Sequence, residues 1–304
     1  MLCTHPGPIV PRVFLRGDFR DDFSGVMARG WRKVFQPYYR FLERRIVRAA
    51  DRISVTTEAL RRDLLSRYGL PPEKVEVVYN IVPSTVEVAK ADKEEDGVQR
   101  IIYAGAMSRV QKPEVLLKAF ALLVAEDAAW PDRLQVEFYG PESPYFSAKI
   151  RKLLTRGCRF GGFRPQAEMA ERVAAADMGF FSLSDATYAY ATPTKLFDYI
   201  EAGVPIVASL PQGASREFVE QYEIGLVADE GDEQGLAHCL REMAKNEALR
   251  LRCRANMASI REQFSPEVQI GKWYKMLKDI GGEEEKALPL SPMDHGTKAF
   301  ETSG

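Results

Sequence analysis

The chain of 304 residues is 45% hydrophobic and 28% charged, the composition of a soluble protein large enough for two modest domains. Its formal net charge of −1 argues against nucleic acid as a partner, and its four cysteines have neither metal-site nor disulfide spacing. Because no apolar run approaches the roughly 18 residues that span a bilayer, and no signal peptide is apparent, a cytoplasmic protein is predicted.

The first 85 residues have the alternation of strands and helices that is typical of half a doubly wound domain. The dipeptide Gln36-Pro37 is expected to kink or restart a helix there. A polar stretch at 85–98 predicts a linker after this partial domain. In chain order the predicted elements are a strand at 11–17, a long helix at 24–49, a strand at 52–57, a helix at 58–69 and a strand at 74–80.

Residues 86–265 predict a complete α/β domain with a parallel, doubly wound sheet, because near-continuous apolar strands alternate with amphipathic helices. A last helix is predicted at 266–280 and a disordered tail at 281–304. The predicted strands are 100–106, 133–140, 158–163, 177–183, 205–209 and 224–228. The predicted helices are 112–127, about 143–156, 166–176, one from Pro193, 213–222 and 235–246.

The segment ATPTKLFDYIEAG follows a predicted strand and has the features of an anion-binding helix start. Thr192 is a plausible N-cap before Pro193, which leaves the N–H groups of Thr194 and Lys195 at the positive end of the helix. Asp198 falls on the same face and suits a pair of hydroxyls such as a ribose diol. The alternative is a solvated Lys–Asp pair three residues apart, and this segment alone leaves the two open.

The turns after the first three strands of this domain also carry small residues and cations. Gly105, Ser108, Arg109 and Lys112 form a small-residue turn with two positive charges, which suits a diphosphate. The alternative is a basic helix start, although cations at that end oppose the helix dipole.

The turns after the second and third strands are built on glycine as well. Gly140 gives a close backbone turn, and Phe163 with Arg164 could hold a flat base through backbone bonds and an apolar wall. The alternative for Phe163 and Arg164 is an ordinary glycine turn at a strand end.

Taken in order, these segments resemble family 4 glycosyltransferases, which are retaining enzymes of the GT-B fold with two Rossmann-like domains. The resemblance rests on YAGAMSRVQKPEVLLKAF, QVEFYGP, FGGF, EMAERVAAADMGFFSL, TPTKLFDYIEAGVPIVAS and EFVEQYEIGLVADEGD, and covers roughly 12–280. It implies transfer of a sugar from a nucleotide-diphosphate sugar to a saccharide or lipid-linked saccharide, as in polysaccharide biosynthesis, without an obligatory metal or cofactor. It also implies that Asp198 holds the ribose hydroxyls, that Lys195 faces the diphosphate, and that the last helix returns to the amino-terminal domain.

The sequence departs from the family pattern in two places. Tyr190 stands where the family often has a glutamate near the transferred sugar. The amino-terminal domain is expected to lack the first strands and their glycine-rich loop, and His5 is readable as a remnant of a strand-end catalytic histidine or as a residue of a mobile terminus. The second departure keeps an alternative open, in which the chain is a non-catalytic nucleotide-sugar-binding module or the donor-binding subunit of a split glycosyltransferase.

The stretch ARGWRKVFQPYYRFLERRIVRAA, which includes 29–48, combines aromatics with seven Arg or Lys residues and one Glu, a local charge of +6. A basic, aromatic helix can lie on the anionic surface of a membrane, which would place the protein peripherally at the inner face. The alternative, preferred on the sequence alone, is that the aromatics pack on the sheet while the arginines face solvent.

Overall fold

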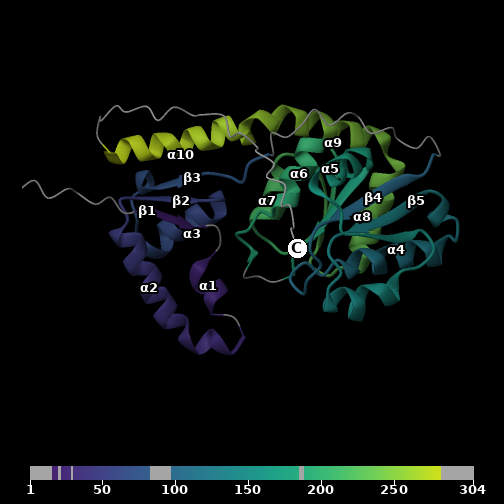
Figure 1. Ribbon diagram of the computed structural model, residues 1–304, viewed down its shortest axis with the longest axis horizontal. Helices are drawn as coiled ribbons and strands as arrows, with labels where there is room; N and C mark the ends of the chain where they lie inside the picture. Colours follow the sequence, from purple (N-terminus) through teal and green to yellow (C-terminus); the bar gives the residue numbers. More distant parts are fainter. Residues whose placement is uncertain (1–15, 20–21, 29, 83–96, 185–187, 282–304) are drawn as a thin grey trace, which may run out of the picture.

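The computed structural model describes residues 16–19, 22–28, 30–82, 97–184 and 188–281. Within them the chain forms a smaller and a larger α/β unit that lie side by side (Figure 1). The strand predicted at 11–17 is described only from Arg16, where a strand does begin. The predicted linker at 85–98 and tail at 281–304 lie almost entirely outside the described residues.

The smaller unit is built on a parallel sheet with the order β1-β2-β3. Its elements are β1 (Arg16–Phe19), α1 (Phe23–Met27), η1 (Gly30–Phe35), α2 (Gln36–Ala49), β2 (Arg52–Val55), α3 (Glu58–Tyr68), η2 (Pro72–Lys74) and β3 (Val75–Val77). The single helix predicted at 24–49 is wrong, because a 3₁₀ stretch separates α1 from α2. The restart predicted at Gln36-Pro37 is confirmed, since the first turn of a helix does not need the N–H that proline lacks.

The larger unit is built on a six-stranded parallel sheet with the order β6-β5-β4-β7-β8-β9. Its strands are β4 (Gln99–Ala104), β5 (Leu134–Tyr139), β6 (Cys158–Gly162), β7 (Met178–Ser182), β8 (Ile206–Leu210) and β9 (Gly225–Asp229). Its helical segments are α4 (Glu114–Glu126), η3 (Trp130–Asp132), η4 (Phe146–Ile150), η5 (Arg151–Leu153), α5 (Gln166–Ala175), α6 (Thr194–Ala202), α7 (Ala214–Gln221), α8 (Glu233–Lys245), α9 (Glu247–Ile260), η7 (Arg261–Phe264) and α10 (Pro266–Gly281).

The core of the larger unit lies on both faces of its sheet. Helices α4 and α8 cover one face, where Phe120 and Leu240 are fully buried, and α5, α6, α7 and α9 cover the other, around Phe197 and Phe264. The central strands β7 and β8 are buried at every position, as parallel strands between two helical layers must be. The predicted doubly wound domain is therefore confirmed.

The order of the strands fixes where a ligand can bind. Successive strands run outward from β4 through β5 to β6 on one side, and from β7 through β8 to β9 on the other. Ligands of such sheets bind beyond the carboxyl ends of the strands, at the point where the order reverses. Here that point lies between β4 and β7.

Two parts of the larger unit differ from the sequence prediction. The helix expected near 143–156 is a π turn followed by a 3₁₀ turn, η4 and η5, in a segment that begins beside Pro141 and Pro144. Helix α9 was not predicted, because the polar run after α8 gives only weak amphipathic periodicity. Asn246 both ends α8 and caps α9, where its side chain accepts a hydrogen bond from the N–H of Leu249.

Helix α10 joins the two units and confirms the predicted return toward the amino-terminal sheet. It runs along the side of the small sheet in Figure 1, and the N–H of Tyr79 donates to Oε1 of Gln269 at 2.9 Å. The backbone N–H of Val82 donates to the carbonyl of Phe264 at 2.8 Å, just before α10 begins. Within the described residues no helix combines the length and the apolar character that crossing a bilayer requires.

Candidate functional site

Three glycine turns meet at the carboxyl ends of β4, β5 and β6. The N–H of Gly105 donates to the carbonyl of Tyr139 at 2.9 Å, and that of Gly140 donates to the carbonyl of Gly162 at 3.0 Å. At Gly140, where φ is +152°, a Cβ atom would lie 2.1 Å from the carbonyl oxygen of Gly105. The close approach of the two backbones therefore requires glycine here.

Lys195, in the first turn of α6, lies beneath these glycine turns. Its side chain is buried, with 6% of the residue exposed, and Nζ has no hydrogen-bond partner among the described residues. Nζ lies 4.1 Å from the ring centroid of Tyr103 and would lie 3.4 Å from a Cβ atom on Gly105. The turn after β4 and the start of α6 thus meet at one unpaired, buried amine.

The burial of Lys195 changes its titration. Burial lowers the pKa of its ammonium group to about 7, and attraction to the Asp198 carboxylate opposes that shift. No ion pair joins Lys195 to a carboxylate within the described part of the chain. An anion placed against Nζ would favour the charged form of Lys195.

Asp198 lies one turn further along α6 and faces solvent. Neighbouring protein atoms raise the pKa of its carboxyl, and the nearby Lys195 ammonium offsets part of that shift. Because the side chain is exposed, we take Asp198 as ionised at neutral pH. The exposed Lys–Asp pair considered from the sequence is wrong, since Lys195 is buried and only Asp198 is in solvent.

The start of α6 corrects one sequence prediction. Thr192 is not the N-cap: α6 begins at Thr194, with Pro193 in extended geometry before it and no side-chain cap. The carbonyl of Thr192 instead accepts a hydrogen bond from Nδ2 of Asn80 at 2.8 Å, and its buried Oγ1 has no partner among the described residues. This hydrogen bond to Asn80 of the smaller unit holds Thr192 outside the helix.

A cleft of about 420 Å³ lies between the two units, beside the start of α6. The smaller unit contributes Thr56 and Asn80, which follow β2 and β3. The cleft is lined by Thr56, Asn80, Ser108, Val110, Gln111, Leu183, Tyr188, Ala191, Thr192, Pro193 and Thr194. The carboxyl ends of both parallel sheets therefore supply one cleft, as expected for two doubly wound units that face each other.

The turn after β4 is held against the segment after β7. Ser184 donates from its N–H to the carbonyl of Val110 at 2.7 Å and from Oγ to the carbonyl of Arg109 at 2.9 Å. Ser108, predicted at the site, lines the cleft. The Arg109 side chain is exposed and does not line it, and Lys112 Nζ lies 3.9 Å from a carboxylate oxygen of Glu230.

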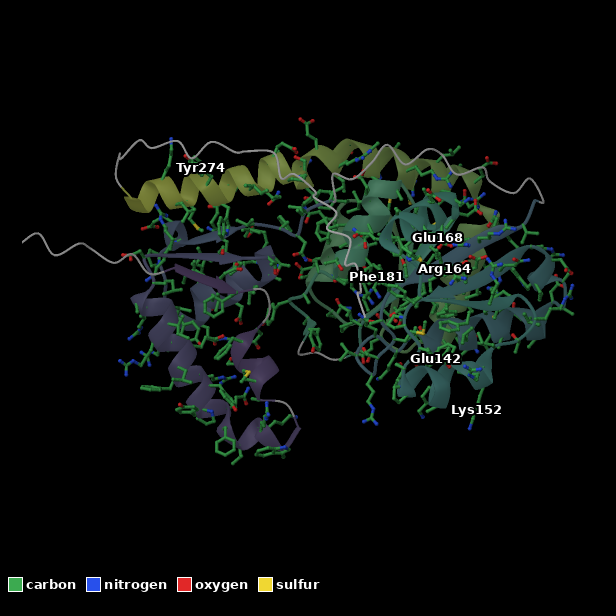
Figure 2. All side chains as sticks on the ribbon, in the orientation of Figure 1. Glu142, Lys152, Arg164, Glu168, Phe181 and Tyr274 are labelled. Atoms are coloured by element: carbon green, nitrogen blue, oxygen red, sulfur yellow. The ribbon has the colours of Figure 1, made fainter. Side chains whose placement is uncertain are left out.

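Phe163 and Arg164 lie apart from the cleft. Phe163 is 69% exposed, while Arg164 donates to the carbonyl of Phe163 at 3.0 Å and pairs with Glu168 at 3.2 Å. Arg164 and Glu168 are labelled near each other in Figure 2. The described contacts of Arg164 are therefore local to its own turn and the following helix. Phe163 remains free to form one wall of a binding surface.

Tyr190 connects the two units. Its hydroxyl donates to Oδ1 of Asp63 at 3.1 Å, and its carbonyl accepts from Oγ1 of Thr57 at 2.9 Å. This residue was expected near a transferred sugar, but its ring packs against the core of the smaller unit. His5 lies outside the described residues, so the structure does not place it.

Thr56, Asn80 and Tyr103 lie at the site although the sequence did not predict them there. Thr56 and Asn80 are polar residues just after strands β2 and β3, a signal that applies to any strand end facing a cleft. Tyr103 reads as a core residue of β4, and only the fold shows its ring beneath Lys195. Within the described residues no group of three or more His, Cys, Asp or Glu is arranged to hold a metal ion.

The comparison with family models decides the relationship of this chain. A model described as glycosyl transferases group 1 matches residues 86–259, and one described as glycosyltransferase family 4 matches 21–85. The chain belongs to the glycosyl transferases group 1 family. The resemblance to family 4 glycosyltransferases drawn from the sequence is thereby confirmed.

Curated relatives of this glycosyltransferase family member are named D-inositol 3-phosphate glycosyltransferase. The protein from Nocardioides sp. is 27% identical over 242 residues, which cover 73% of this chain and 52% of the relative. That from Geodermatophilus obscurus is 23% identical over 264 residues, which cover 81% of this chain and 57% of the relative. The chain spans about half the length of these relatives.

Solved structures show the same fold. An α,α-trehalose-phosphate synthase from Burkholderia xenovorans has a TM-score of 0.67 at 13% identity, over 89% of this chain and 68% of that one. WaaG, a glycosyltransferase involved in lipopolysaccharide biosynthesis, has a TM-score of 0.64 at 17% identity, over 90% and 79%. The pneumococcal O-GlcNAc transferase GtfA, solved with UDP and GlcNAc, has a TM-score of 0.62 at 16% identity, over 80% and 48%. The two Rossmann-like units therefore have the GT-B fold.

Proposed function

We propose that this protein transfers a sugar, with retention, from a nucleotide-diphosphate sugar to a saccharide or lipid-linked saccharide. The observation that carries the proposal is the buried, unpaired Nζ of Lys195 beneath the glycine turns of β4 and β5. A diphosphate supplies the anion that this amine lacks. Family membership and neighbours solved with UDP or sugars support the same class of ligand.

The chemistry needs positive charge where the leaving group forms. As the bond from the sugar to the diphosphate breaks, negative charge accumulates on the phosphate oxygens, and fixed donors that meet this charge lower the barrier. Lys195 and the N–H groups at the start of α6 would supply those donors, because the first N–H groups of a helix have no partner within it. Asp198 would accept from the ribose hydroxyls, and the adjoining cleft would hold the acceptor against the sugar.

Acceptor-dependent release of nucleoside diphosphate is the experiment that tests this function. The chain is incubated with a nucleotide sugar and candidate saccharide or lipid-linked acceptors, and the anomeric configuration of the product is read by NMR. Release that depends on the acceptor and gives a product of unchanged configuration is expected. Inversion at the anomeric carbon would contradict the retaining mechanism.

A second candidate is nucleotide-sugar binding without transfer, as a module or as the donor-binding subunit of a split enzyme. The glycine turns and Lys195 all belong to the larger unit, whereas the smaller unit has a three-stranded sheet within the described residues. In that case the chain would bind nucleoside diphosphate but release none from the sugar donor, whichever acceptor is added. The same assay therefore separates the two candidates.

Asp198→Asn is expected to weaken nucleoside diphosphate binding roughly ten- to a hundredfold. A hydrogen bond to a charged group contributes about 1.5–3 kcal/mol, and the amide can accept but carries no charge. Titration with both the diphosphate and the free nucleoside should show similar losses, because the ribose is common to both. Glu201→Gln, which removes a carboxylate from the far end of α6, is the matched control and should leave both affinities unchanged. A loss confined to the diphosphate would contradict the ribose role.

Binding of a nucleotide sugar should weaken as the pH rises above 7. The lowered pKa of about 7 means that Lys195 is charged below this pH and mostly neutral at pH 8, while the ligand needs the charged form. Affinity should fall about tenfold between pH 6 and pH 8, and the chain should take up a proton on binding. Titration across this range checks it, with Lys195→Met as the control whose residual binding is independent of pH. An unchanged affinity in the natural chain would contradict the account.

A further inference from the structure

The segment of η1 and α2 exposes its aromatic side chains, contrary to the packing expected from the sequence. We call Gly30–Arg48 the aromatic–basic arm. Trp31 is 77% exposed and Val34 72%, and the 3₁₀ stretch η1 buries none of its residues. The prediction that these aromatics pack on the sheet is wrong. The exposed large hydrophobic residues of the arm are Trp31, Val34, Phe35, Tyr38, Phe41 and Ile46.

The inner face of α2 is fixed by charge as well as by packing. Glu43 is fully buried, and its Oε2 accepts from Arg67 of α3 at 3.1 Å and from the hydroxyl of Tyr68. Arg67 also pairs with Asp22 at 3.0 Å and with Asp63 at 2.5 Å. This network fixes the orientation of α2 within the smaller unit. The opposite face of α2 is therefore held pointing outward.

Four exposed residues of the arm form one stripe along α2. Tyr38, Phe41, Arg45 and Arg48 follow one another at intervals of three, four and three residues. Residues at this spacing share one face of a helix. The stripe begins with aromatic side chains and ends with arginines, so its character changes along the arm.

The positive charges of the arm have no acidic partners within the described residues. The single acid of α2 is Glu43, which is already engaged by Arg67. Arg40, Arg44 and Arg48 line a cavity of about 520 Å³ with Phe41 and Arg67. The guanidinium groups of Arg32 and Arg45 lie 5.9 Å from the ring centroids of Trp31 and Phe41. The cations of the arm without an acidic partner in the described part of the chain are Arg32, Lys33, Arg40, Arg44, Arg45 and Arg48.

We propose that the aromatic–basic arm docks on the surface of an anionic phospholipid bilayer. Aromatic side chains with apolar bodies and polar edges favour the headgroup boundary, and the arginines would meet the lipid phosphates. A second copy of the chain would bring like charges together, and a purely apolar partner would leave the cations unmatched. The arm belongs to the unit that contributes Thr56 and Asn80 to the cleft, so docking would bring the cleft to lipid-borne acceptors.

Vesicle co-sedimentation tests the proposal without any glycosyl transfer. The full chain is mixed with vesicles of phosphatidylcholine alone or with added phosphatidylglycerol, at low and at high salt. Binding is expected only to the vesicles with phosphatidylglycerol, and it should weaken with salt. The triple variant Arg40→Gln, Arg44→Gln, Arg48→Gln should lose roughly a hundredfold in vesicle affinity, and Trp31→Ser with Phe41→Ser a comparable amount. Inorganic phosphate at millimolar concentration should not compete.

The control variant is on α10, which also exposes aromatic and basic residues. Tyr274, labelled in Figure 2, is 54% exposed on the side of the small sheet away from α2. Tyr274→Ser with Lys275→Gln should bind vesicles as the natural chain does, and all variants should melt alike. Equal binding to neutral vesicles, no binding at all, or loss in the α10 variant would overturn the proposal. Self-association abolished by Trp31→Ser with Phe41→Ser would overturn it too, in favour of a contact between copies.

Discussion

Lys195→Met is expected to stabilise the free protein while it weakens binding of nucleoside diphosphate roughly a hundredfold. The folded chain holds the pKa of Lys195 at about 7, below its usual value of 10.5, so the folded state binds fewer protons than the unfolded state between these values. The lysine therefore opposes folding most below pH 7, and this cost diminishes as the pH rises toward 10.5. Methionine fills a similar volume without a charge, so stability at pH 6 should rise by on the order of a few kcal/mol.

The same substitution should weaken diphosphate binding by about 3 kcal/mol or more, which is roughly a hundredfold, because the ligand loses its only buried cation in the described site. Thermal melting at pH 6 and at pH 9, together with ligand titration, measures both effects. Lys118→Met is the matched control, because Lys118 is an exposed lysine paired with Glu233 at the surface and should change neither quantity appreciably. A Lys195→Met variant that is less stable at pH 6 would show that the lysine supports the fold instead.

Gly140→Ala should destabilise the protein strongly. The new Cβ atom would lie 2.1 Å from the carbonyl oxygen of Gly105, and the φ of +152° is itself unfavourable for alanine. Both backbones must move, which should cost about 2–4 kcal/mol of stability. Because Gly105 adjoins the Nζ of Lys195, the same shift should weaken binding of nucleoside diphosphate.

Gly203→Ala is the control for Gly140→Ala, because it introduces backbone strain at a positive φ without a clash between atoms. Gly203, at the end of α6, has a φ of +63° but no atom within 4 Å of the added Cβ. Its substitution should cost about 1 kcal/mol and leave ligand affinity unchanged, since the residue is far along the helix from Lys195. Chemical denaturation and titration of the two variants make the comparison. Equal losses of stability in both would mean that the contact between Gly140 and Gly105 has no special role.

The secondary structure of the larger unit could be predicted from the sequence because its pattern is local. Strands such as β7 and β8 are continuous apolar runs, and the helices between them are amphipathic. Helix α9 was missed because its stability comes from packing of Cys253 and Met257 into the core rather than from strong periodicity. The break between α1 and α2 could be predicted only in part. Pro37 indicated that a helix restarts there, but no sequence feature indicated the 3₁₀ stretch before it.

The candidate site was only partly predictable, because it depends on contacts between distant segments. The prediction that Lys195 and the glycine turns share one edge of the sheet follows from their places after the strands. That Lys195 is buried over Tyr103, and that Thr192 is tied to Asn80 instead of capping α6, requires the packing of the two units. The contacts of Tyr190 with the smaller unit could not be predicted either, because they too depend on how the two units pack.

Calorimetric titration of the 304-residue chain with UDP, GDP and ADP tests the central claim most directly. The claim is that the unpaired Nζ of Lys195, under the turns at Gly105 and Gly140, is a site for a nucleoside diphosphate. We expect saturable binding of at least one of the three nucleotides, with proton uptake at pH 8 and with the affinity lost in Lys195→Met. No heat from any of the three at millimolar concentration, or equal affinity in Lys195→Met, would contradict the account.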